Sequence, residues 1–264
     1  MKIFRCLAVL LLGLLALSGT LSAQQTQPDP ARLHVVLMVG QSNMAGRAPI
    51  GAEDKKPIPG AFLWNPTVGK WVPALPPYNL HSPNRKGVEM QRLNAGPSFA
   101  RAYLKAHPGA EIGIVCMARG GTSIEEWEPG REKPYPLYDT AVAATKTALE
   151  GGGHLAGILW HQGESNNSRV DAYPEQLRML VASFRADLKV RDLPFVFGQL
   201  GSWRPEYELF NRMLLEQPGR IDHTACVETK GLGKIDDAHF STAAQRSLGE
   251  RYAAELEKLL RQEK

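Results

Sequence analysis

Residues 33–46 read Leu-His-Val-Val-Leu-Met-Val-Gly-Gln-Ser-Asn-Met-Ala-Gly. The apolar run, rich in β-branched residues, stops at Gly40 and is followed by small polar side chains, which is typical of a buried strand that ends in a turn. Ser42 then lies between the carboxyl end of a strand and the start of a helix, where parallel sheets have their ligand crevice. Taken alone, this position favours a simpler role, in which Ser42 only caps the helix.

Four more apolar runs look like buried strands, and segments with helical periodicity separate them. Such alternation predicts an α/β fold with an open parallel sheet and helices on both faces. The expected strands are 33–39, 112–117, 155–160, 194–200 and 225–227. The expected helices lie near 97–106, over 138–149 and 173–188, and from Ser241 onwards, where Thr242 and Gln245 have the spacing of a capping box.

Residues 47–96 interrupt this alternation, because they are rich in proline and follow neither period. Within them, residues 62–72 look like a small hairpin around a turn. A long segment after the first strand lies over the same sheet edge as Ser42, and such excursions usually form lids or substrate walls. We therefore expect this segment to contribute to the functional site.

The N-terminus predicts export. Residues 1–23 combine a short basic start, an apolar core from Leu7 to Leu17 and small residues at a plausible cleavage point, which is the pattern of a secretory signal peptide. The apolar core is too short for the alternative, an uncleaved membrane anchor. Residues 24–264 then form one exported domain of ordinary size, in the periplasm or secreted.

Charge balance and cysteine content narrow the possible partners. The chain has 31 basic and 27 acidic residues, or +4, and removal of Lys2 and Arg5 with the signal peptide leaves +2. A nearly neutral protein is not strongly attracted to nucleic acid or to a membrane surface. Export permits disulfides, but Cys116 and Cys226 fall on separate expected strands, which favours two free thiols over a bridge.

Polar clusters follow three of the other expected strands. Residues 118–123 read Ala-Arg-Gly-Gly-Thr-Ser, residues 161–166 read His-Gln-Gly-Glu-Ser-Asn, and residues 236–240 read Asp-Asp-Ala-His-Phe. Sheets of this kind bind ligands outside the carboxyl ends of their strands. These three clusters should therefore converge on the same site as Ser42.

The residue types in these clusters suit acyl transfer. A serine hydroxyl becomes a strong nucleophile when an adjacent imidazole removes its proton, and a carboxylate holds that imidazole in one tautomer. Ser42, His239 and Asp236 fit these three roles, because Asp-x-x-His spacing lets both side chains leave a single turn. Asp237 is the competing carboxylate, and it is disfavoured because adjacent side chains usually point apart.

The developing oxyanion needs fixed donors, and a glycine pair offers backbone N–H groups that a ligand can approach closely. We expect the N–H groups of Ser42 and Gly121 and the side-chain amide of Gln162 to donate, with Gly120 as the alternative glycine. Glu164 is either an acid in the site or, as we favour, a carboxylate that braces the surrounding loops.

Several further polar side chains lie next to these motifs in the sequence. Gln41 and Asn43 flank Ser42, and we expect them to support the site or to contact the substrate. Arg119 either steers a substrate or pairs with a nearby carboxylate. His161 lies beside the site but has no carboxylate at a fixed local spacing, so it is not the expected base.

Four motifs occur in order along the chain: Gly-Gln-Ser-Asn-Met from Gly40, Gly-Gly-Thr from Gly120, Gln-Gly-Glu-Ser from Gln162, and Asp-x-x-His ending at His239. Together they resemble the SGNH (GDSL-type) hydrolase superfamily. Within it, they are most similar to the sialate O-acetylesterase-like branch, carbohydrate esterase family 6, which includes acetylxylan esterases. Each motif alone is weak, whereas four in order are specific.

The resemblance implies a flavodoxin-like three-layer α/β/α sandwich with a five-stranded parallel sheet and no metal or other cofactor. It implies removal of O-acetyl groups from acetylated xylan, sialic acid or a related glycan through an acyl-enzyme intermediate. It assigns Ser42 as nucleophile, His239 as base and Asp236 as its partner. The usual oxyanion Asn of the superfamily is replaced by Gln162, as in this branch. In the strand order of the family the two cysteines lie near opposite sheet edges, which also disfavours a disulfide.

Some alternatives are excluded and others stay open. An α/β-hydrolase is disfavoured because no serine here has the Gly-x-Ser-x-Gly pattern, and the chain contains neither the His-Glu-x-x-His motif of zinc hydrolases nor a phosphate-binding loop. A lipid or thioester hydrolase and an inactive carbohydrate-binding protein both fit the same fold. Four tryptophans could stack on sugar rings, although packing in the core or in loops explains each of them better: Trp64, Trp71, Trp127 and Trp203.

Overall fold

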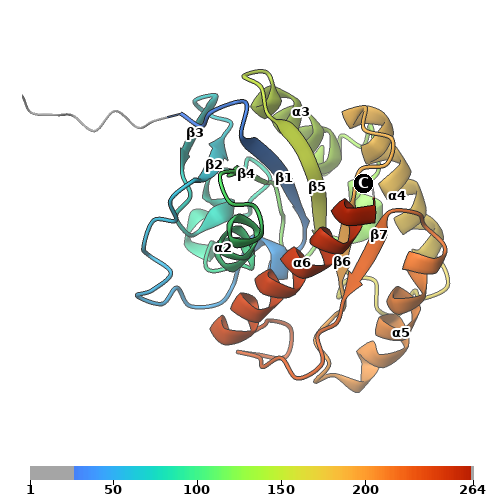
Figure 1. Cartoon of the computed structure of the whole chain (residues 1–264). Coiled ribbons are helices and arrows are strands. Elements are labelled where there is room, and N and C mark those ends of the chain that lie inside the picture. Colours follow the sequence, from blue (N-terminus) through green and yellow to red (C-terminus); the bar gives the residue numbers. More distant parts are fainter. Residues whose placement is uncertain (1–26, 263–264) are drawn as a thin grey trace, which may run out of the picture.

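The computed structural model describes residues 27–262, so the expected signal peptide lies outside the described residues. Its centre is one sheet with the strand order β3-β2-β4-β1-β5-β6-β7 (Figure 1). Five of these strands are the expected ones, and they pair with one another in parallel. Their carboxyl ends therefore lie at the same edge of the sheet. They are β1 (Leu33–Gly40), β4 (Glu111–Cys116), β5 (His154–His161), β6 (Phe195–Gly198) and β7 (Thr224–Val227).

The sheet has seven strands rather than the expected five, because the predicted hairpin joins its edge. The hairpin consists of β2 (Ala61–Asn65) and β3 (Lys70–Pro73), which pair antiparallel, while β2 pairs in parallel with β4. This pairing satisfies N–H and C=O groups that β4 would otherwise leave unpaired at an edge. Trp64 and Trp71 face each other across the hairpin with ring centroids 5.1 Å apart, and both are buried.

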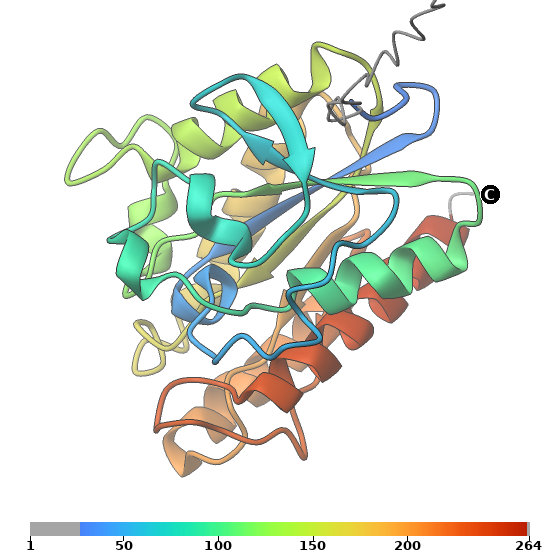
Figure 2. The same ribbon diagram turned by 90° about the vertical axis from the view of Figure 1, so that its left-hand side faces the viewer.

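Helices cover both faces of the sheet, as predicted. One face carries α2 (Gly96–Ala106) and α6 (Thr242–Gln262), which lie side by side (Figure 2). The other face carries α3 (Leu137–Leu149), α4 (Tyr173–Leu188) and α5 (Glu208–Glu216). Helix α5 is not among the predicted helices, because the apolar pattern of its nine residues is too short to stand out.

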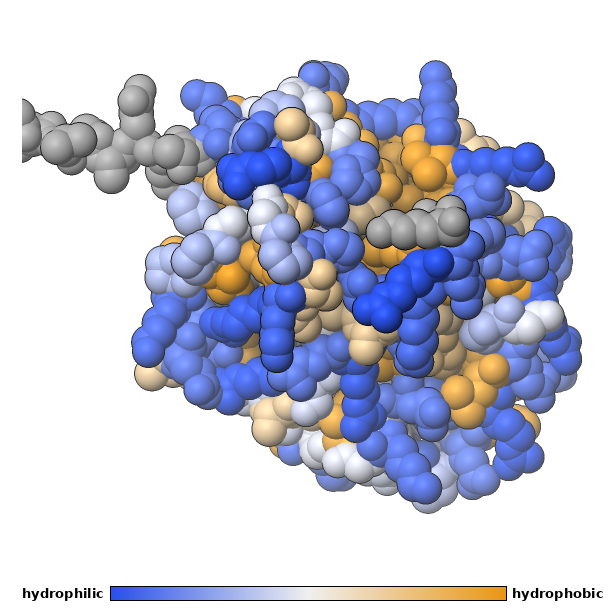
Figure 3. All heavy atoms as spheres, viewed as in Figure 1, coloured by the Kyte–Doolittle hydropathy of each residue, from blue (hydrophilic) through white to orange (hydrophobic). Residues whose placement is uncertain are grey.

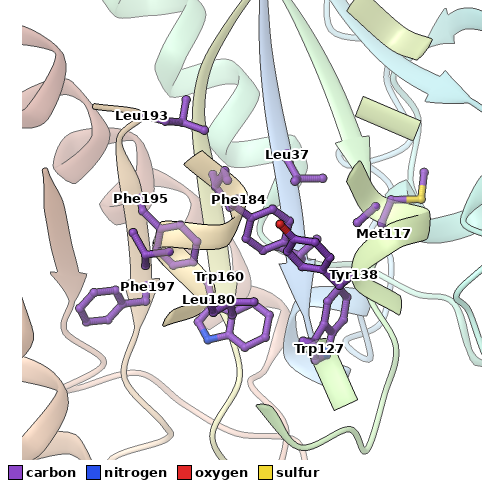
Figure 4. Close-up of a cluster of buried hydrophobic side chains, with 14 of the residues drawn as sticks. Leu37, Met117, Trp127, Tyr138, Trp160, Leu180, Phe184, Leu193, Phe195 and Phe197 are labelled. Carbon is purple, nitrogen blue, oxygen red and sulfur yellow. The ribbon is translucent and has the colours of Figure 1, made fainter. Parts of the chain in front are cut away.

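Two apolar clusters, one on each side of the sheet, hold these layers together. On the side of α3 and α4, Trp127 and Trp160 meet edge to face with ring centroids 5.4 Å apart, among other aromatic side chains (Figure 4). On the other side, Phe99 of α2 and Leu256 of α6 are fully buried against the sheet. The sheet is therefore the middle layer of an α/β/α sandwich.

The face that bears α6 is mainly hydrophilic (Figure 3). Apolar side chains appear on it in small separate groups rather than in one broad patch, which is ordinary for a protein surface. Within residues 27–262, none of the helices combines the length and the apolar character that a membrane crossing requires.

Two local expectations had different outcomes. Cys116 and Cys226 are free thiols, and three strands of the sheet separate β4 from β7. The capping box at the start of α6, by contrast, is wrong. Ser241 Oγ accepts the N–H of Ala244, while the Thr242 hydroxyl donates to Pro49 O, 2.7 Å away. The preceding serine therefore supplies the cap and leaves Thr242 to tie the helix to residues 47–96.

Residues 47–96 cover the carboxyl edge of the sheet beside β4. Asn79 donates to Ala118 O and accepts the Ala118 N–H, and Asn84 donates to Met117 O, so two buried amides dock the segment onto the chain just beyond β4. These amides replace the backbone partners that an irregular segment lacks. The remaining short elements are α1 (Ser42–Ala45) and the 3-10 turns η1 (Tyr78–His81), η2 (Val88–Met90), η3 (Ile124–Trp127), η4 (Pro205–Tyr207) and η5 (Gln217–Gly219).

Candidate active site

Ser42 is the first residue of α1, directly beyond β1. The chain turns at Gly40, whose φ of +135° and close approach to the His161 carbonyl leave no room for a Cβ. The Ser42 side chain does not cap α1, which has no side-chain cap hydrogen bond. Instead, Ser42 Oγ lies 3.0 Å from His239 Nε2. The simpler interpretation of Ser42 as a helix cap is therefore wrong.

The imidazole of His239 bridges Ser42 and Asp236. His239 Nδ1 lies 2.8 Å from Asp236 Oδ2, and Asp236 Oδ1 accepts the backbone N–H groups of Ala238 and His239, each at 2.8 Å. Partial burial tends to raise the pKa of Asp236, but hydrogen bonds from His239 and Ala238 outweigh it and lower that pKa. An ionised Asp236 favours the tautomer with the proton on Nδ1, which turns the Nε2 lone pair toward Ser42.

The competing carboxylate, Asp237, points away from this imidazole. Its Oδ1 lies 2.7 Å from Lys234 Nζ, and 82% of its side chain is exposed. That ion pair lowers the pKa of Asp237. The structure therefore brings Asp236, and not its neighbour, to His239, as the alternation of adjacent side chains predicts.

Three backbone N–H groups near Ser42 are free to bind an oxyanion. The N–H groups of Ser42, Gly120 and Gly121 have no hydrogen-bond acceptor among the described residues. Gly121 has a φ of +76°, a conformation that favours glycine, and it is exposed where Gly120 is buried. Both glycines thus remain candidates, and the accessible one is Gly121.

The side-chain amide of Gln162 is not free in the same way. Gln162 Nε2 donates to Thr122 O at 3.0 Å and to Asn166 Oδ1 at 2.7 Å, with Gln41 Oε1 as a third acceptor at 3.2 Å. Tyr173 Oη donates to Gln162 Oε1, which fixes the orientation of the amide. An amide has only two protons. In this arrangement Gln162 has no proton left for an oxyanion, contrary to our expectation, and it ties together the loops that follow β4 and β5.

Asn43 connects the loop of His239 to Glu164. Asn43 Nδ2 donates to Glu164 Oε1 at 2.5 Å and to Ala238 O at 2.9 Å, while Asn43 Oδ1 accepts the Phe240 N–H at 3.2 Å. One amide therefore holds the residues on both sides of His239. Burial raises the pKa of Glu164 to about 7, against the effect of its own backbone hydrogen bond and of Asn43. These contacts fit the bracing role expected for Glu164.

Arg119 neither pairs with a carboxylate nor reaches Ser42. Its Nη1 donates to Asn84 O at 2.8 Å, and its guanidinium lies 3.4 Å from the ring centroid of Tyr135. Arg119 is buried, whereas 43% of Tyr135 is exposed. Arg119 therefore anchors the 84–85 stretch beside the site, a role that neither of its two expected interpretations describes.

The remaining candidates lie outside the Ser42–His239 contact. His161 is fully enclosed, its Nδ1 lies 2.9 Å from Tyr252 Oη, and burial lowers its pKa to about 4, so it is a neutral packing residue. Trp64, Trp71 and Trp127 are buried. Trp203 is half-buried, packs edge to face on Phe240 and donates to Asp237 O. Packing thus explains all four tryptophans.

Fold and geometry together define a class of protein. A serine, a histidine and an aspartate are linked in series at the carboxyl edge of a parallel sheet, beside unpaired backbone N–H groups, which is the arrangement of a serine hydrolase. No group of three or more His, Cys, Asp or Glu side chains within residues 27–262 is placed to hold a metal ion.

Comparisons with known proteins lead from the class to the family. Residues 32–258 match the family model described as carbohydrate esterase, sialic acid-specific acetylesterase. A probable carbohydrate esterase from Arabidopsis thaliana is 28% identical over 231 residues, which cover 81% of this chain and 86% of that protein. The crystal structure of the Arabidopsis protein superposes with a TM-score of 0.76 at 26% identity, covering 85% of this chain and 98% of the other.

Two further solved structures share the fold. The structure of NanS has a TM-score of 0.67 at 20% identity and covers 90% of this chain and 99% of its own. A carbohydrate acetylesterase from Xanthomonas citri has a TM-score of 0.61 at 21% identity and covers 85% of this chain and 56% of its own. The chain belongs to the carbohydrate esterase, sialic acid-specific acetylesterase family, and it is a carboxylic ester hydrolase that acts on carbohydrates.

Proposed function

We propose that this protein removes O-acetyl groups from a carbohydrate with Ser42 as nucleophile, His239 as general base and Asp236 as the residue that orients the base. The observation that carries this proposal is the unbroken series of contacts from Asp236 Oδ2 to His239 Nδ1 and from His239 Nε2 to Ser42 Oγ, at 2.8 and 3.0 Å. Both distances are within the reach needed for proton transfer.

The reaction proceeds in two halves. Ser42 Oγ attacks the acetyl carbonyl carbon while His239 Nε2 takes the hydroxyl proton. The carbonyl oxygen becomes an oxyanion, which accepts hydrogen bonds from the N–H groups of Ser42 and Gly121, with Gly120 as the alternative donor. The intermediate then collapses: the bond from carbon to the sugar oxygen breaks, and His239 returns the proton to that oxygen. Acetyl-Ser42 remains.

The second half regenerates the serine. A water molecule gives a proton to His239 Nε2 and attacks the acetyl carbon. The bond from carbon to Ser42 Oγ then breaks, His239 Nε2 gives its proton to Ser42 Oγ, and acetic acid leaves and ionises to acetate. Asp236 stays ionised throughout and stabilises the imidazolium that forms in each half. Gln162 and Glu164 take no part in proton transfer; they hold the loops, through Thr122 and Asn43 respectively.

Acetate release from acetylated sugars tests the proposal, with p-nitrophenyl acetate as a substrate without a sugar. The wild-type protein should turn over both, and rapid quenching followed by mass spectrometry should find one acetyl group on Ser42. Ser42→Ala should abolish the adduct. An inert wild type would leave a carbohydrate-binding protein as the better explanation, and an adduct on another residue would overturn the assignment of Ser42.

We also propose that the protein is exported after cleavage near residue 23, on the basis of the N-terminal sequence pattern. N-terminal sequencing of the protein recovered from the medium or the periplasm tests this. A mature chain that begins in the region of Gln24 supports export, whereas recovery of the full chain in the cytoplasm contradicts it.

A further inference from the structure

The proposed reaction places the leaving sugar on one side of Ser42. The oxyanion turns toward the N–H groups of Ser42 and Gly121, beyond β1 and β4. The sugar oxygen must instead come within reach of His239 Nε2, because this atom returns the proton to it. The sugar that leaves therefore lies beside the loop that carries His239.

Trp203 connects that loop to a hollow in the surface. The rings of Trp203 and Phe240 meet edge to face with centroids 4.9 Å apart, and Trp203 Nε1 donates to Asp237 O at 3.1 Å. Trp203 also lines a hollow of ≈ 690 Å³, which lies among α5 and the chain that leaves β6 and β7 (Figure 1). Small-molecule sites commonly have volumes of about 300–1,000 Å³. The hollow thus adjoins the loop beside which the leaving sugar must lie.

Two buried amides hold the inner surface of this hollow in place. Asn211 of α5 donates to Leu200 O at 3.0 Å and accepts the Leu200 N–H at 2.8 Å. Gln199 donates to Asn211 O at 3.0 Å and accepts the Thr229 N–H at 3.2 Å. These bonds tie the chain beyond β6 and β7 to α5. The hollow is therefore formed before any ligand binds, as is usual for small-molecule sites.

The indole of Trp203 is fixed by packing and is still partly exposed. A Cβ placed on Gly201 would lie 2.3 Å from the indole ring, so only a glycine lets the ring lie against the backbone there. The opposite partner, Phe240, directly follows His239 in the chain. The part of the indole that remains exposed lines the hollow. Trp203 is thus a rigid apolar wall between the hollow and the His239 loop.

Glu228 and Lys230 line the hollow from the chain beyond β7. Arg251 of α6 donates to Glu228 O at 2.6 Å and to Lys230 O at 3.3 Å, which fixes the backbone of both residues. Both residues are exposed, and within residues 27–262 their side chains take part in no hydrogen bond or ion pair. A carboxylate and an ammonium are therefore available to a ligand on a fixed backbone.

The chemistry of this lining suits a sugar ring. Sugars present apolar C–H groups together with hydroxyls, and a hydroxyl both donates and accepts hydrogen bonds. Trp203 supplies an apolar surface, while Glu228 can accept from a hydroxyl and Lys230 can donate to one. Three basic and two acidic side chains line the hollow, so its charge is nearly balanced and gives no strong attraction to a highly charged ligand.

We propose that this hollow is a second sugar subsite, in which Trp203, Glu228 and Lys230 bind the unit linked to the acetylated one. The inference rests on the proposed function of Ser42, and it makes chain length part of the choice of substrate. An acetylated oligosaccharide is then a better substrate than the same acetylated monosaccharide. Binding of the neighbouring unit helps to orient the reacting ester, so it raises kcat as well as lowering KM.

Substrate pairs that differ only in chain length test the subsite. One pair is a mono-O-acetylated methyl xyloside and mono-O-acetylated xylotriose. The other is an O-acetylated N-acetylneuraminic acid and the same acetylated unit within sialyllactose. Acetate release gives kcat/KM for each member, and the measured quantity is the ratio of the oligosaccharide value to the monosaccharide value. A general loss of activity cancels in this ratio.

The variants to compare with the wild type are Trp203→Leu, Glu228→Gln, Lys230→Met and the double variant of the last two. The wild type should show a ratio of about ten or more in at least one pair. Trp203→Leu and the double variant should lower this ratio toward one, and each single change at Glu228 or Lys230 should lower it less. Lys70→Met is the matched control and should keep the ratio, because Lys70 is an exposed lysine on β3, at the opposite edge of the sheet from β7.

A ratio near one in both pairs would overturn the subsite, and so would a ratio that Trp203→Leu and the double variant both leave unchanged. If Trp203→Leu does not fold, the double variant decides, because it alters only exposed side chains. Turnover of p-nitrophenyl acetate separates this inference from the proposed function. A wild type that hydrolyses this ester but neither oligosaccharide, or that shows no dependence on chain length, lacks only the subsite. If it hydrolyses no ester, the proposed function fails.

Discussion

Histidines lie at both ends of the central sheet, in opposite environments. At the carboxyl end, His239 lies between the Asp236 carboxylate and the Ser42 hydroxyl. At the amino end, the rings of His34 of β1 and His154 of β5 are tilted by 56° with centroids 4.1 Å apart. The ring of His107, at the end of α2, has its centroid 5.4 Å from that of His34. His34 Nδ1 forms a hydrogen bond with Tyr103 Oη, and His107 Nε2 lies against the carboxylate of Glu257.

The two ends differ in what surrounds the imidazole. A carboxylate beside His239 fixes its tautomer and stabilises the charge that it gains as a base. At the amino end, burial, followed by the neighbouring rings of His154 and His107, lowers the pKa of His34 to about 4. Burial and then His107 likewise lower the pKa of His154. The same residue type is therefore a candidate base at one end of the sheet, whereas at the other end its surroundings disfavour the protonated form.

The largest expected effect tests this contrast directly. Ser42→Ala or His239→Ala should lower kcat by about 10³-fold or more, because the members of a triad act as a unit. His34→Gln is the matched control at the opposite end, and it should keep kcat close to that of the wild type. Steady-state kinetics with p-nitrophenyl acetate measures both. Comparable losses in kcat for His34→Gln and His239→Ala would contradict the assignment of His239 as the base.

A smaller loss is expected for the carboxylate. Asp236→Asn should lower kcat by roughly 10²- to 10³-fold, because the Asn side chain no longer holds the imidazole in the productive tautomer, and because Asp236 is half exposed so that water partly replaces it. Asp237→Asn is the control, since Asp237 pairs with Lys234 instead. If the two variants lose equal activity, the structural choice between these carboxylates is wrong.

Loss of the hydrogen bonds that hold the His239 loop should lower kcat less than loss of a triad side chain. Asn43→Ala removes the contacts to Glu164, Ala238 and Phe240 and should lower kcat by about 10- to 100-fold through misplacement of His239. Glu164→Gln keeps an oxygen that can accept from Asn43, so it should retain most of the activity and should remove a titration near pH 7 from the pH–rate profile. An unchanged kcat for Asn43→Ala would show that the loop keeps His239 in position without the Asn43 hydrogen bonds.

The smallest expected effect is on the pH dependence of stability, and it comes from the histidines at the amino end of the sheet. The pKa values of His34 and His154 are lowered in the folded state from 6.5, so the unfolded chain binds protons first as the pH falls. This contribution to stability is present above pH 6.5 and is lost as the pH falls toward about 4, where His34 titrates in the folded state. Urea unfolding between pH 7 and pH 4.5 should show a loss of about 1 kcal/mol that is absent from the double variant His34→Gln, His154→Gln. A double variant with the same pH slope as the wild type would contradict this assignment.

Much of the fold follows from local patterns in the sequence. The five central strands are apolar runs, and α2, α3, α4 and α6 follow their predicted ranges closely, because long periodic segments are the strongest signal in a sequence. Helix α5 is too short to give such a signal. The hairpin is recognisable, but its docking on β4 depends on a distant strand edge, so the sequence predicts two strands without predicting where they pair.

The candidate site divides in the same way. Asp-x-x-His spacing predicts the Asp236–His239 contact, since three residues fit within one turn. The motif Gln-Gly-Glu-Ser places Gln162 at the site, but its protons go to Thr122 and Asn166, whose positions depend on two other loops.

By itself, the sequence determined the α/β class, the strand ends that carry function, and the serine, histidine and aspartate that meet there, because each depends on periodicity or on short spacing. Only the tertiary structure decided which acceptor each hydrogen-bond donor meets. In the folded protein Ser42 Oγ lies beside His239 Nε2 instead of capping α1, and the amide protons of Gln162 are donated to acceptors within the protein. The physical reason is that the allocation of donors and acceptors depends on groups brought together from distant parts of the chain, and on which of them remain exposed.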